Sequence, residues 1–413
     1  MSAERMNPDE DQPAAAHRLR SLLRKLPVGI WGLGLTSMFM DISSELVHSL
    51  LPLLMSGVLG AGMLTIGLIE GFAEATASIT KLFSGSLSDH WGRRRPLLVL
   101  GYGMAALTKP VFPLAASIAA VVAARFVDRV GKGIRGAPRD ALVADITAPE
   151  LRGAAYGLRQ ALDSLGAALG PLLAILAMLW LAGDVRAVMW VGVVPAFIAV
   201  ALLLWMVKEP VNAPHAARRP APISRASMRQ LSARYWYVTG LGAVFTLARF
   251  SEAFLVLRAQ QTGFPLTWVP LVMVVMNVLY AGAAWPAGIA ADRRDPRVLL
   301  LAGLLLLVLA DVVLARAGSG PLVLCGAALW GLHMALTQGL FSRLVANAAP
   351  VELRGTAFGV YNFVTGISLL FSSAIAGALW SSYGSSATFH AGAAFAVLTA
   401  CGLPFTSLHE TRR

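Results

Sequence analysis

Long apolar runs separated by short polar segments make up most of the chain. Each run reaches about 20 residues, the length that an α-helix needs to cross the hydrocarbon core of a bilayer. Because lipid offers the backbone no hydrogen-bond partners, a span of this kind folds as a helix. The runs lie at 27–56, 62–88, 96–116, 118–146, 153–181, 187–207, 236–261, 266–291, 297–316, 321–347, 354–382 and 387–406. The pattern predicts an all-α membrane protein of about twelve transmembrane helices.

The polar segments between these runs alternate in charge. Lys and Arg gather at 93–95, at 152, between 208 and 234, at 293–297 and at 354, whereas the loops at 57–62, 261–266 and 381–386 contain neither. Basic loops stay in the cytoplasm, so both termini are predicted to be cytoplasmic, which requires an even number of spans. The expected location is the cell (inner or plasma) membrane, with a lipid bilayer around a multi-pass chain.

One long polar stretch, rich in Pro, Ala and Arg, interrupts the middle of the chain at 208–235. A segment of this composition is typical of a linker between two folded units. The predicted organisation is therefore a cytoplasmic tail at 1–26, a six-helix bundle at 27–207, the linker, a second six-helix bundle at 236–406 and a tail at 407–413. The first tail does not resemble a cleavable signal peptide.

The two halves share four short motifs in the same order. Ser44-Glu45 is repeated as Ser251-Glu252, Gly85-x3-Asp89 as Gly288-x3-Asp292, Leu142-Val-Ala-Asp145 as Leu344-Val-Ala-Asn347, and Glu150-Leu-Arg-Gly153 as Glu352-Leu-Arg-Gly355. The offsets, 202 to 207 residues, are close to half the chain. They indicate a duplicated six-span unit and hence two pseudo-symmetric bundles. Repeats of this kind place a substrate site between the halves, near the middle of the bilayer.

Composition and charge exclude several classes of protein. Only 14% of the residues are charged, against about 25% in soluble domains. The net charge of +12 lies in loops and in the spans and is not interleaved with base-stacking aromatic residues, so no nucleic-acid partner is expected. Cys325 and Cys401 lie far apart in apolar runs, and no metal or cofactor is predicted. Gly131 to Gly136 matches G-x-G-x-x-G, but a dinucleotide site needs this motif between a strand and a helix, and here it lies within a span.

The loop after the second span resembles the signature of the major facilitator superfamily (MFS). The segment from Gly85 through Asp89 and Gly92 to Arg95 matches the pattern Gly-x3-Asp-Arg-x-Gly-Arg-Arg, with His90 in place of the first Arg. A degenerate copy follows the eighth span, and the resemblance covers nearly the whole chain. It implies the twelve-helix MFS fold and transport by alternating access. The residues that would form a gating loop are Gly85, Asp89, Gly92, Arg93, Gly288 and Asp292; the alternative is a plain cytoplasmic turn with arginines that fix the orientation.

Two further segments resemble MFS motifs in part. Arg125 corresponds to an arginine in the fourth span of the family, but Asp128 and Arg129 stand where the family often has Gln-Gly. Gly166 to Pro171 resembles a fifth-span motif of proton-coupled exporters without its trailing Gly pair. Gly166 and Gly170 present a small-residue face for helix packing, and Pro171 removes a helical hydrogen bond. Ordinary helix packing explains this motif as well as a role in coupling does.

Ionisable residues inside the spans are costly and mark functional sites. A carboxylate in a cavity can bind and release a proton near neutral pH, and the candidates for this role are Asp41, Glu45, Glu74, Asp163 and Glu252. The candidates for the substrate cavity are His48, Arg125, Asp128, Arg129, Lys132, Arg135, Arg249, His333, Gln338 and Asn362. The alternative is structural ion pairing, of Asp41 or Glu45 with Arg129, Asp163 with Lys132, and Arg249 with Glu252. Because most of these charges precede residue 208, the first half is expected to handle protons and charge, and the second to supply shape and apolar contact.

Together these observations predict a monomeric secondary transporter of the proton-coupled efflux type. It would export a small amphiphilic or anionic organic compound in exchange for protons. One alternative is an importer of an organic anion or metal chelate by proton symport. A non-transporting membrane sensor is an alternative of another class. No nucleophile–base pair or metal constellation supports an enzyme.

Overall fold

The structure is a computed structural model that describes residues 25–91, 93–209, 228–293, 295–337, 339–350 and 353–406. For residues 86, 89, 90, 285, 292, 293 and 355 it describes the backbone only. The first half contains α2 (Val28–Leu53), η1 (Leu54–Val58), α3 (Met63–Trp91), α4 (Arg95–Thr108), α5 (Val111–Leu114), α6 (Ile118–Asp145), η2 (Pro149–Leu151), α7 (Arg152–Trp180), α8 (Val185–Val191) and α9 (Val193–Met206). The second half contains α11 (Ala233–Leu247), α12 (Ala253–Gln261), η3 (Leu266–Trp268), α13 (Leu271–Arg293), α14 (Pro296–Arg316), α15 (Gly320–Thr337), α16 (Leu340–Ala348), α17 (Arg354–Tyr383), α18 (Ser385–Gly402) and η5 (Leu403–Thr406).

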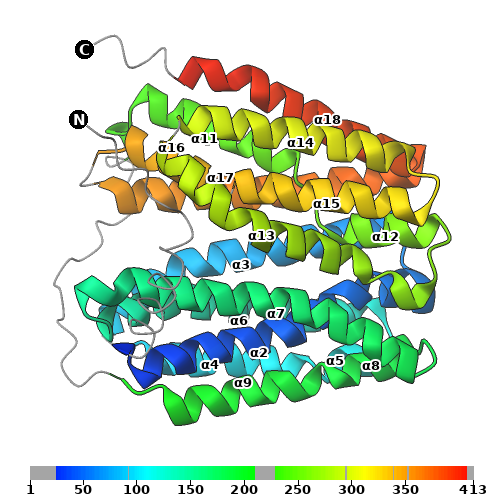
Figure 1. Ribbon diagram of the computed structural model, residues 1–413, viewed down its shortest axis with the longest axis horizontal. Helices are drawn as coiled ribbons and strands as arrows, with labels where there is room; N and C mark the ends of the chain where they lie inside the picture. The colour runs from blue at the N-terminus through cyan, green and yellow to red at the C-terminus, as the bar shows by residue number, and fades with distance from the viewer. Residues whose placement is uncertain are drawn as a thin grey trace, which may run out of the picture.

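The helices form two bundles, one from each half of the chain. In Figure 1 the first half occupies the lower part of the molecule and the second half the upper part, with α3 and α13 where they meet. α2 begins and α18 ends at the left-hand end, which we call the basic end because the loop at 93–95 lies there. The fold class predicted from the apolar runs and the repeats is confirmed.

The helices match the twelve predicted spans closely, but they differ in polarity. By length and composition, nine helices of the described part of the chain are apolar enough to cross a membrane. The other three predicted spans correspond to α3, to α6 and to the α11–α12 pair. These three carry Glu70 and Glu74, the cations of α6, and Arg249 with Glu252. Charged residues interrupt the apolar surface of α3 and α6, whereas the break leaves α11 and α12, with 15 and 9 residues, each too short to cross a membrane alone.

The seventh predicted span is not one continuous helix. α11 ends at Leu247, α12 begins at Ala253, and the backbone between them is not helical. Two serines of α17 satisfy backbone groups that the break leaves free, because Ser372 Oγ donates to the Leu247 carbonyl (2.9 Å) and Ser373 Oγ accepts from the Ser251 amide (3.1 Å). Non-helical backbone at membrane depth is tolerated where the protein supplies such partners.

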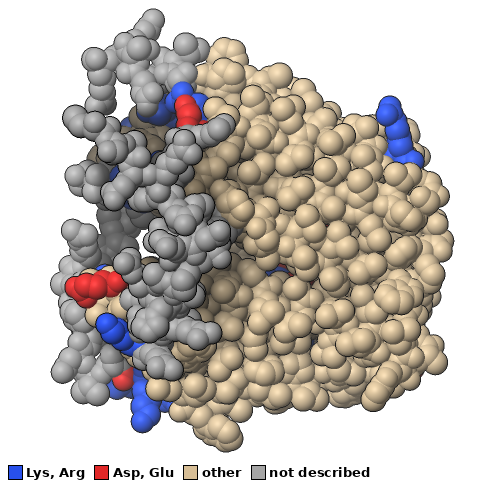
Figure 2. All heavy atoms as spheres, viewed as in Figure 1, with Lys and Arg blue, Asp and Glu red and all other residues tan. Residues whose placement is uncertain are grey.

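The outer face of the molecule is apolar between its two ends. Figure 2 shows the charged side chains of this face gathered at the left, one basic group at the upper right, and an uncharged band between them. Large hydrophobic side chains are exposed on the helices, including Phe83, Leu107 and Trp180. A surface of this kind is stable against lipid, as the composition predicts.

The halves pack tightly where α3 meets α17. A Cβ atom added to Gly71 would lie 2.7 Å from the Leu370 carbonyl oxygen, and one added to Gly377 would lie 2.5 Å from that of Met63. Glycine therefore allows the two backbones to approach closely. Hydrogen bonds near the end opposite to the basic end also join the halves, from Ser56 to Gln260 (3.2 Å) and from the Leu64 amide to Ser381 (3.2 Å).

Candidate functional site

A cavity of about 380 Å³ lies between the two halves, at the level of the helix break. The first half lines it with Glu45, His48, Glu74, Arg129, Lys132 and Ala167, and the second half with Phe245, Thr246, Arg249, Phe250, Ser251, Glu252, Asn277, Trp330, Met334 and Leu369. The first half therefore supplies mainly charge. The second half supplies mainly aromatic and apolar surface, together with Arg249 and Glu252.

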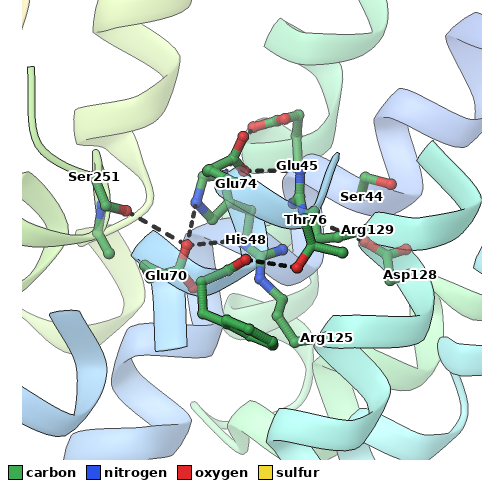
Figure 3. A network of polar contacts seen from close by, with 12 residues as sticks. Ser44, Glu45, His48, Glu70, Glu74, Thr76, Arg125, Asp128, Arg129 and Ser251 are labelled. Atoms are coloured by element: carbon green, nitrogen blue, oxygen red, sulfur yellow. Dashed lines mark hydrogen bonds and ion pairs between the residues drawn. The ribbon is translucent and has the colours of Figure 1, made fainter. Parts of the chain in front are cut away.

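A buried ion pair lies in the first half, behind the cavity residue His48. Arg125 Nη2 of α6 lies 2.6 Å from Glu70 Oε2 of α3, and both side chains are almost fully excluded from solvent. Figure 3 shows Glu70 at the centre of a network that His48 enters from α2 and Ser251 from the second half. The same Glu70 oxygen lies 3.6 Å from His48 Nε2 and 3.4 Å from Ser251 Oγ. The network therefore links the core of the first half to the helix break of the second.

Arg129 and Asp128 join a second chain of ion pairs beside the cavity. Arg129 Nη1 lies 2.9 Å from Glu74 Oε1, and its Nε lies 3.6 Å from Asp128 Oδ2. Asp128 also accepts a hydrogen bond from Lys109 Nζ (2.9 Å), which donates to Ser44 Oγ as well (3.1 Å). Because buried charges of both signs alternate here, each has a partner that offsets part of the cost of removing it from water.

A separate cluster of charges lies between the cavity and the basic end. Asp163 Oδ2 accepts from Arg159 Nη1 (2.6 Å) and lies 3.7 Å from Arg139 Nη1. Arg139 also donates to Ser37 Oγ (2.9 Å). Asp41 is half-buried beside this cluster, where Asp163 and Arg139 act on it electrostatically. Asp41 and Asp163 do not line the cavity that Glu45, Glu74 and Glu252 share.

The ion pairs differ from those predicted from the sequence. Arg129 pairs with Glu74 and Asp128 in place of Asp41 or Glu45. Asp163 pairs with arginines in place of Lys132, because Arg159 is one helical turn away on the same helix. The predicted pair of Arg249 with Glu252 is absent, since the helix is broken between these residues and the i, i+3 geometry is lost.

Two cations of the cavity have no acidic partner. Among the residues whose side chains the structure describes, no Asp or Glu oxygen lies within 4.0 Å of Lys132 or of Arg249. The Arg249 guanidinium lies 5.6 Å from the centroid of the Phe245 ring. Among the described side chains, the one basic nitrogen within this range of Glu45 is His48 Nδ1, at 3.7 Å. The site thus offers two free cations, one from each half, beside a wall of Phe245, Phe250 and Trp330.

Comparisons with known proteins agree with this architecture. The model of the Major Facilitator Superfamily matches residues 33–373 and 259–412. The chain belongs to the major facilitator superfamily. An uncharacterised MFS-type transporter of Methanocaldococcus jannaschii is 30% identical over 368 residues, which cover 86% of this chain and 89% of the relative. The multidrug resistance protein MdtH of Aeromonas salmonicida is 26% identical over 341 residues, 80% of this chain and 82% of that protein.

Among solved structures, the human organic anion transporter MFSD10 shares the fold. It is 19% identical and superposes with a TM-score of 0.62, over 91% of this chain and 99% of its own. At this identity the likeness concerns the arrangement of the helices alone. The chain is therefore a multi-pass membrane transporter of the MFS fold.

The MFS-like motif of the fifth span packs α7 against α2. A Cβ atom on Gly166 would lie 2.5 Å from the Met38 carbonyl oxygen, and one on Gly170 would lie 2.7 Å from that of Ile42 and 2.8 Å from Glu45 Cβ. Pro171 is buried within α7. The motif brings α7 directly against the backbone that carries Glu45. The G-x-G segment of α6 likewise packs closely, because a Cβ on Gly131 would lie 2.6 Å from the Gly101 carbonyl oxygen.

The MFS loop signature lies at the basic end, within the first half. Arg94 Nε lies 2.5 Å from Asp145 Oδ2, and the amides of Arg94 and Arg95 donate to the Glu209 carboxylate (2.7 and 2.8 Å). Gly85 packs against Ala137, since a Cβ atom on this glycine would lie 3.3 Å from the alanine side chain, while Arg93 and Gly288 are exposed. Gly92 and the side chains of Asp89 and Asp292 lie outside the described residues, and the gating role of all six candidates stays a prediction.

The remaining cavity candidates lie away from the cavity. Arg125 and Asp128 are buried in the ion pairs given above, and Arg135 stacks on Tyr102, with its guanidinium 4.4 Å from the ring centroid. His333 is fully buried and its Nδ1 lies 2.8 Å from the Gly303 carbonyl oxygen. Asn362 is exposed on α17. Gln338 lies outside the described residues.

Several residues of the site were missed by sequence reasoning. Glu70 shares a helical face with Glu74, and this spacing could have placed it among the candidates. Lys109 stands alone in an apolar run, which is itself a signal of a buried partner. Phe250 and Trp330 gave no signal, because aromatic residues are common in every span.

Proposed function

We propose that this transporter exports a small organic anion with an apolar or aromatic part, by alternating access and in exchange for protons. The observation that carries the proposal is the pair of cations without acidic partners, Lys132 and Arg249, which face one cavity from opposite halves. An anionic group between them would be stabilised by both, and its apolar part would lie against Phe250 and Trp330.

The placement of the charges also supports a coupled cycle. An anion held by one cation from each half joins the halves while it is bound, and its release removes that attraction. A rocking motion of two rigid bundles about a central site is the usual form of alternating access in such folds. The protonatable groups that border the same cavity are Glu45, Glu74 and Glu252. Protonation of one of them would make the cavity more positive by one unit and so raise its affinity for an anion. This electrostatic effect alone favours the symport alternative, whereas exchange requires the proton and the anion to bind in turn.

A thermal-shift screen of the purified protein is the first test. The panel contains aromatic carboxylates, aliphatic carboxylates, metal–citrate chelates, organic cations and neutral amphiphiles. A compound that binds the folded state raises the melting temperature by mass action. We expect aromatic carboxylates to give the largest rise and to lose it in Lys132→Gln and in Arg249→Gln. Arg152→Gln, an exposed position on α7 away from the cavity, is the matched control. A panel in which organic cations bind best, unaffected by either variant, would refute the proposal.

Direction and coupling are tested in proteoliposomes with the aromatic carboxylate that binds best. A pH gradient, acidic on the side away from the substrate, should drive its accumulation on the acidic side if protons and anion exchange. With the substrate supplied on the acidic side, its accumulation on the opposite side would indicate the symport importer instead. A protein that binds the carboxylate without moving it, with or without a gradient, would favour the sensor.

A further inference from the structure

A second carboxyl group, remote from the charged clusters, is sealed inside the second half. Asp311 lies on α14 and is fully buried, and neither of its carboxyl oxygens has a hydrogen-bond partner among the residues that the structure describes. No Lys, Arg or His nitrogen of the described side chains lies within ion-pair distance of it. An ionised carboxylate with neither water nor a partner is strongly unfavourable, so a group placed in this way is held as the neutral acid.

The ring of Phe250 lies beside this carboxyl group and also lines the cavity. A Cβ atom on Gly392 of α18 would lie 2.6 Å from Asp311 Oδ2 and 2.9 Å from Phe250 Cε1, so the carboxyl group and the ring meet over this glycine. Phe250 also lines the cavity and lies in the break between α11 and α12. The rings of Trp330 and Phe389 hold it in place, with centroids 5.3 and 5.6 Å away. A movement of the non-helical segment would therefore bring Asp311 to the water of the cavity.

Among the groups around Asp311, Asp311 itself is the one that would bind and release a proton. On α15, which packs against α14, the Trp330 ring lies beside Phe250 and His333, and His333 Nδ1 is already bonded to the Gly303 carbonyl. Gly392 of α18 also lies beside Asp311. Arg249, which precedes Phe250 in the break, lines the cavity. We infer that Asp311 is a proton-binding site of the second half, closed by Phe250 in this conformation and opened when the α11–α12 connection moves. The inference rests on the proposed proton coupling and assigns one proton of the cycle to a residue outside the charged first half.

Proton release measures this site without a substrate. Unbuffered protein in detergent is titrated from about pH 6 to about pH 10, a range in which an exposed Asp is already ionised. The wild type is expected to release one proton more per molecule than Asp311→Asn, whose amide matches the neutral acid in size. Asp295→Asn, at the exposed start of the same helix, should release as many protons as the wild type. Equal release by the wild type and Asp311→Asn would overturn the inference.

Chemical labelling gives an independent test that does not require the Asn variant to fold. A water-soluble carbodiimide with glycinamide converts a carboxyl group that reaches water into an amide, which mass spectrometry locates. Asp311 of the wild type should react slowly, and at least tenfold faster in Phe250→Ala. No reaction at Asp311 in either protein would show that it stays sealed and would overturn the inference. If a pH gradient drives transport but the wild type and Asp311→Asn release equally many protons, only the role of Asp311 is rejected. If the two proteins differ by one proton but a pH gradient drives no flux, the proposed coupling is rejected and the proton-binding site at Asp311 stands.

Discussion

Replacing Glu70 by Gln removes the anion from a fully buried ion pair and leaves Arg125 behind. The two side chains are 0% and 3% exposed and meet at 2.6 Å, so water cannot take the place of the carboxylate. The Gln amide can still accept a hydrogen bond from Arg125, but it cannot balance its charge. Breaking a buried pair in this way costs about 3–5 kcal/mol. His48 and Ser251 approach the same oxygen, so the loss reaches the wall of the cavity as well.

The measurement is the free energy of unfolding in mixed micelles, from a denaturant titration followed by tryptophan fluorescence. A loss of about 3 kcal/mol lowers the folding equilibrium constant about a hundredfold or more, since 1.36 kcal/mol is a factor of ten. Asp145→Asn is the matched control, because it breaks the Arg94 pair at the basic end, where both side chains are about one-fifth exposed. Pairs with access to solvent contribute about 0–1 kcal/mol.

A double variant separates lost charge balance from lost shape. Glu70→Gln with Arg125→Met removes both charges and should recover much of the stability that Glu70→Gln loses, because replacing both members of a buried pair by neutral side chains is often neutral or stabilising. If Glu70→Gln unfolds within 1 kcal/mol of Asp145→Asn, or if the double variant is less stable than the single one, the reasoning about this ion pair is refuted.

Three further predictions concern helix contacts and coupling. Gly170→Ala should destabilise the protein by about 1–3 kcal/mol through overpacking. Gly157→Ala in the same helix, where a Cβ atom meets nothing within 4 Å, should leave the melting temperature equal or higher. A Gly170→Ala variant as stable as the wild type would contradict the close packing at this glycine. Glu45→Gln should abolish transport driven by a pH gradient and keep a native melting curve, and wild-type gradient-driven flux in this variant would remove Glu45 from the mechanism. Ser373→Ala should lower the stability by about 1–3 kcal/mol, because it leaves a backbone amide of the helix break without its acceptor. Ser368→Ala should lower the stability less, because the Ser368 hydroxyl bonds within its own helix. Equal losses in thermal melts would show that the break does not depend on Ser373.

The spans could be predicted from the sequence because their length is set by the bilayer and their composition by lipid. The break in the seventh span could not. Residues 248–252 contain neither Gly nor Pro, the usual local causes of a helix break. The stabilising groups, Ser372 and Ser373, lie more than 120 residues away in sequence. A local pattern cannot report partners that only the tertiary fold brings together.

The partners of the charged residues could not be predicted from the local sequence pattern either. α6 carries cations at three- and four-residue steps, which indicate a face but not what that face meets. Only Arg129 and Lys132 of this series line the cavity, while Arg125 and Arg135 are buried within the first half. Which cation meets the cavity depends on the rotation of α6 against α3 and α4. Close contacts at Gly131 and Gly133 fix that rotation, and the sequence alone shows the glycines without their partners.

The division of charge between paired and unpaired residues bears directly on the proposed cycle. A buried pair resists rearrangement, because separating it exposes both charges to a medium that solvates neither. The pairs of Glu70 with Arg125 and of Asp128 with Lys109 therefore hold α6 against α3 and against the end of α4. Among the described side chains no ion pair joins the halves. The contacts there are close packing along α3 and α17, hydrogen bonds between neutral groups, such as that of Asn277 with the Ala167 carbonyl (3.0 Å), and the longer bond from the Ser251 hydroxyl to Glu70 (3.4 Å). Such contacts can part and re-form at lower cost, so the plane between the bundles is where movement is expected. Lys132 and Arg249, which have no acidic partner among the described side chains, border the cavity that lies on this plane.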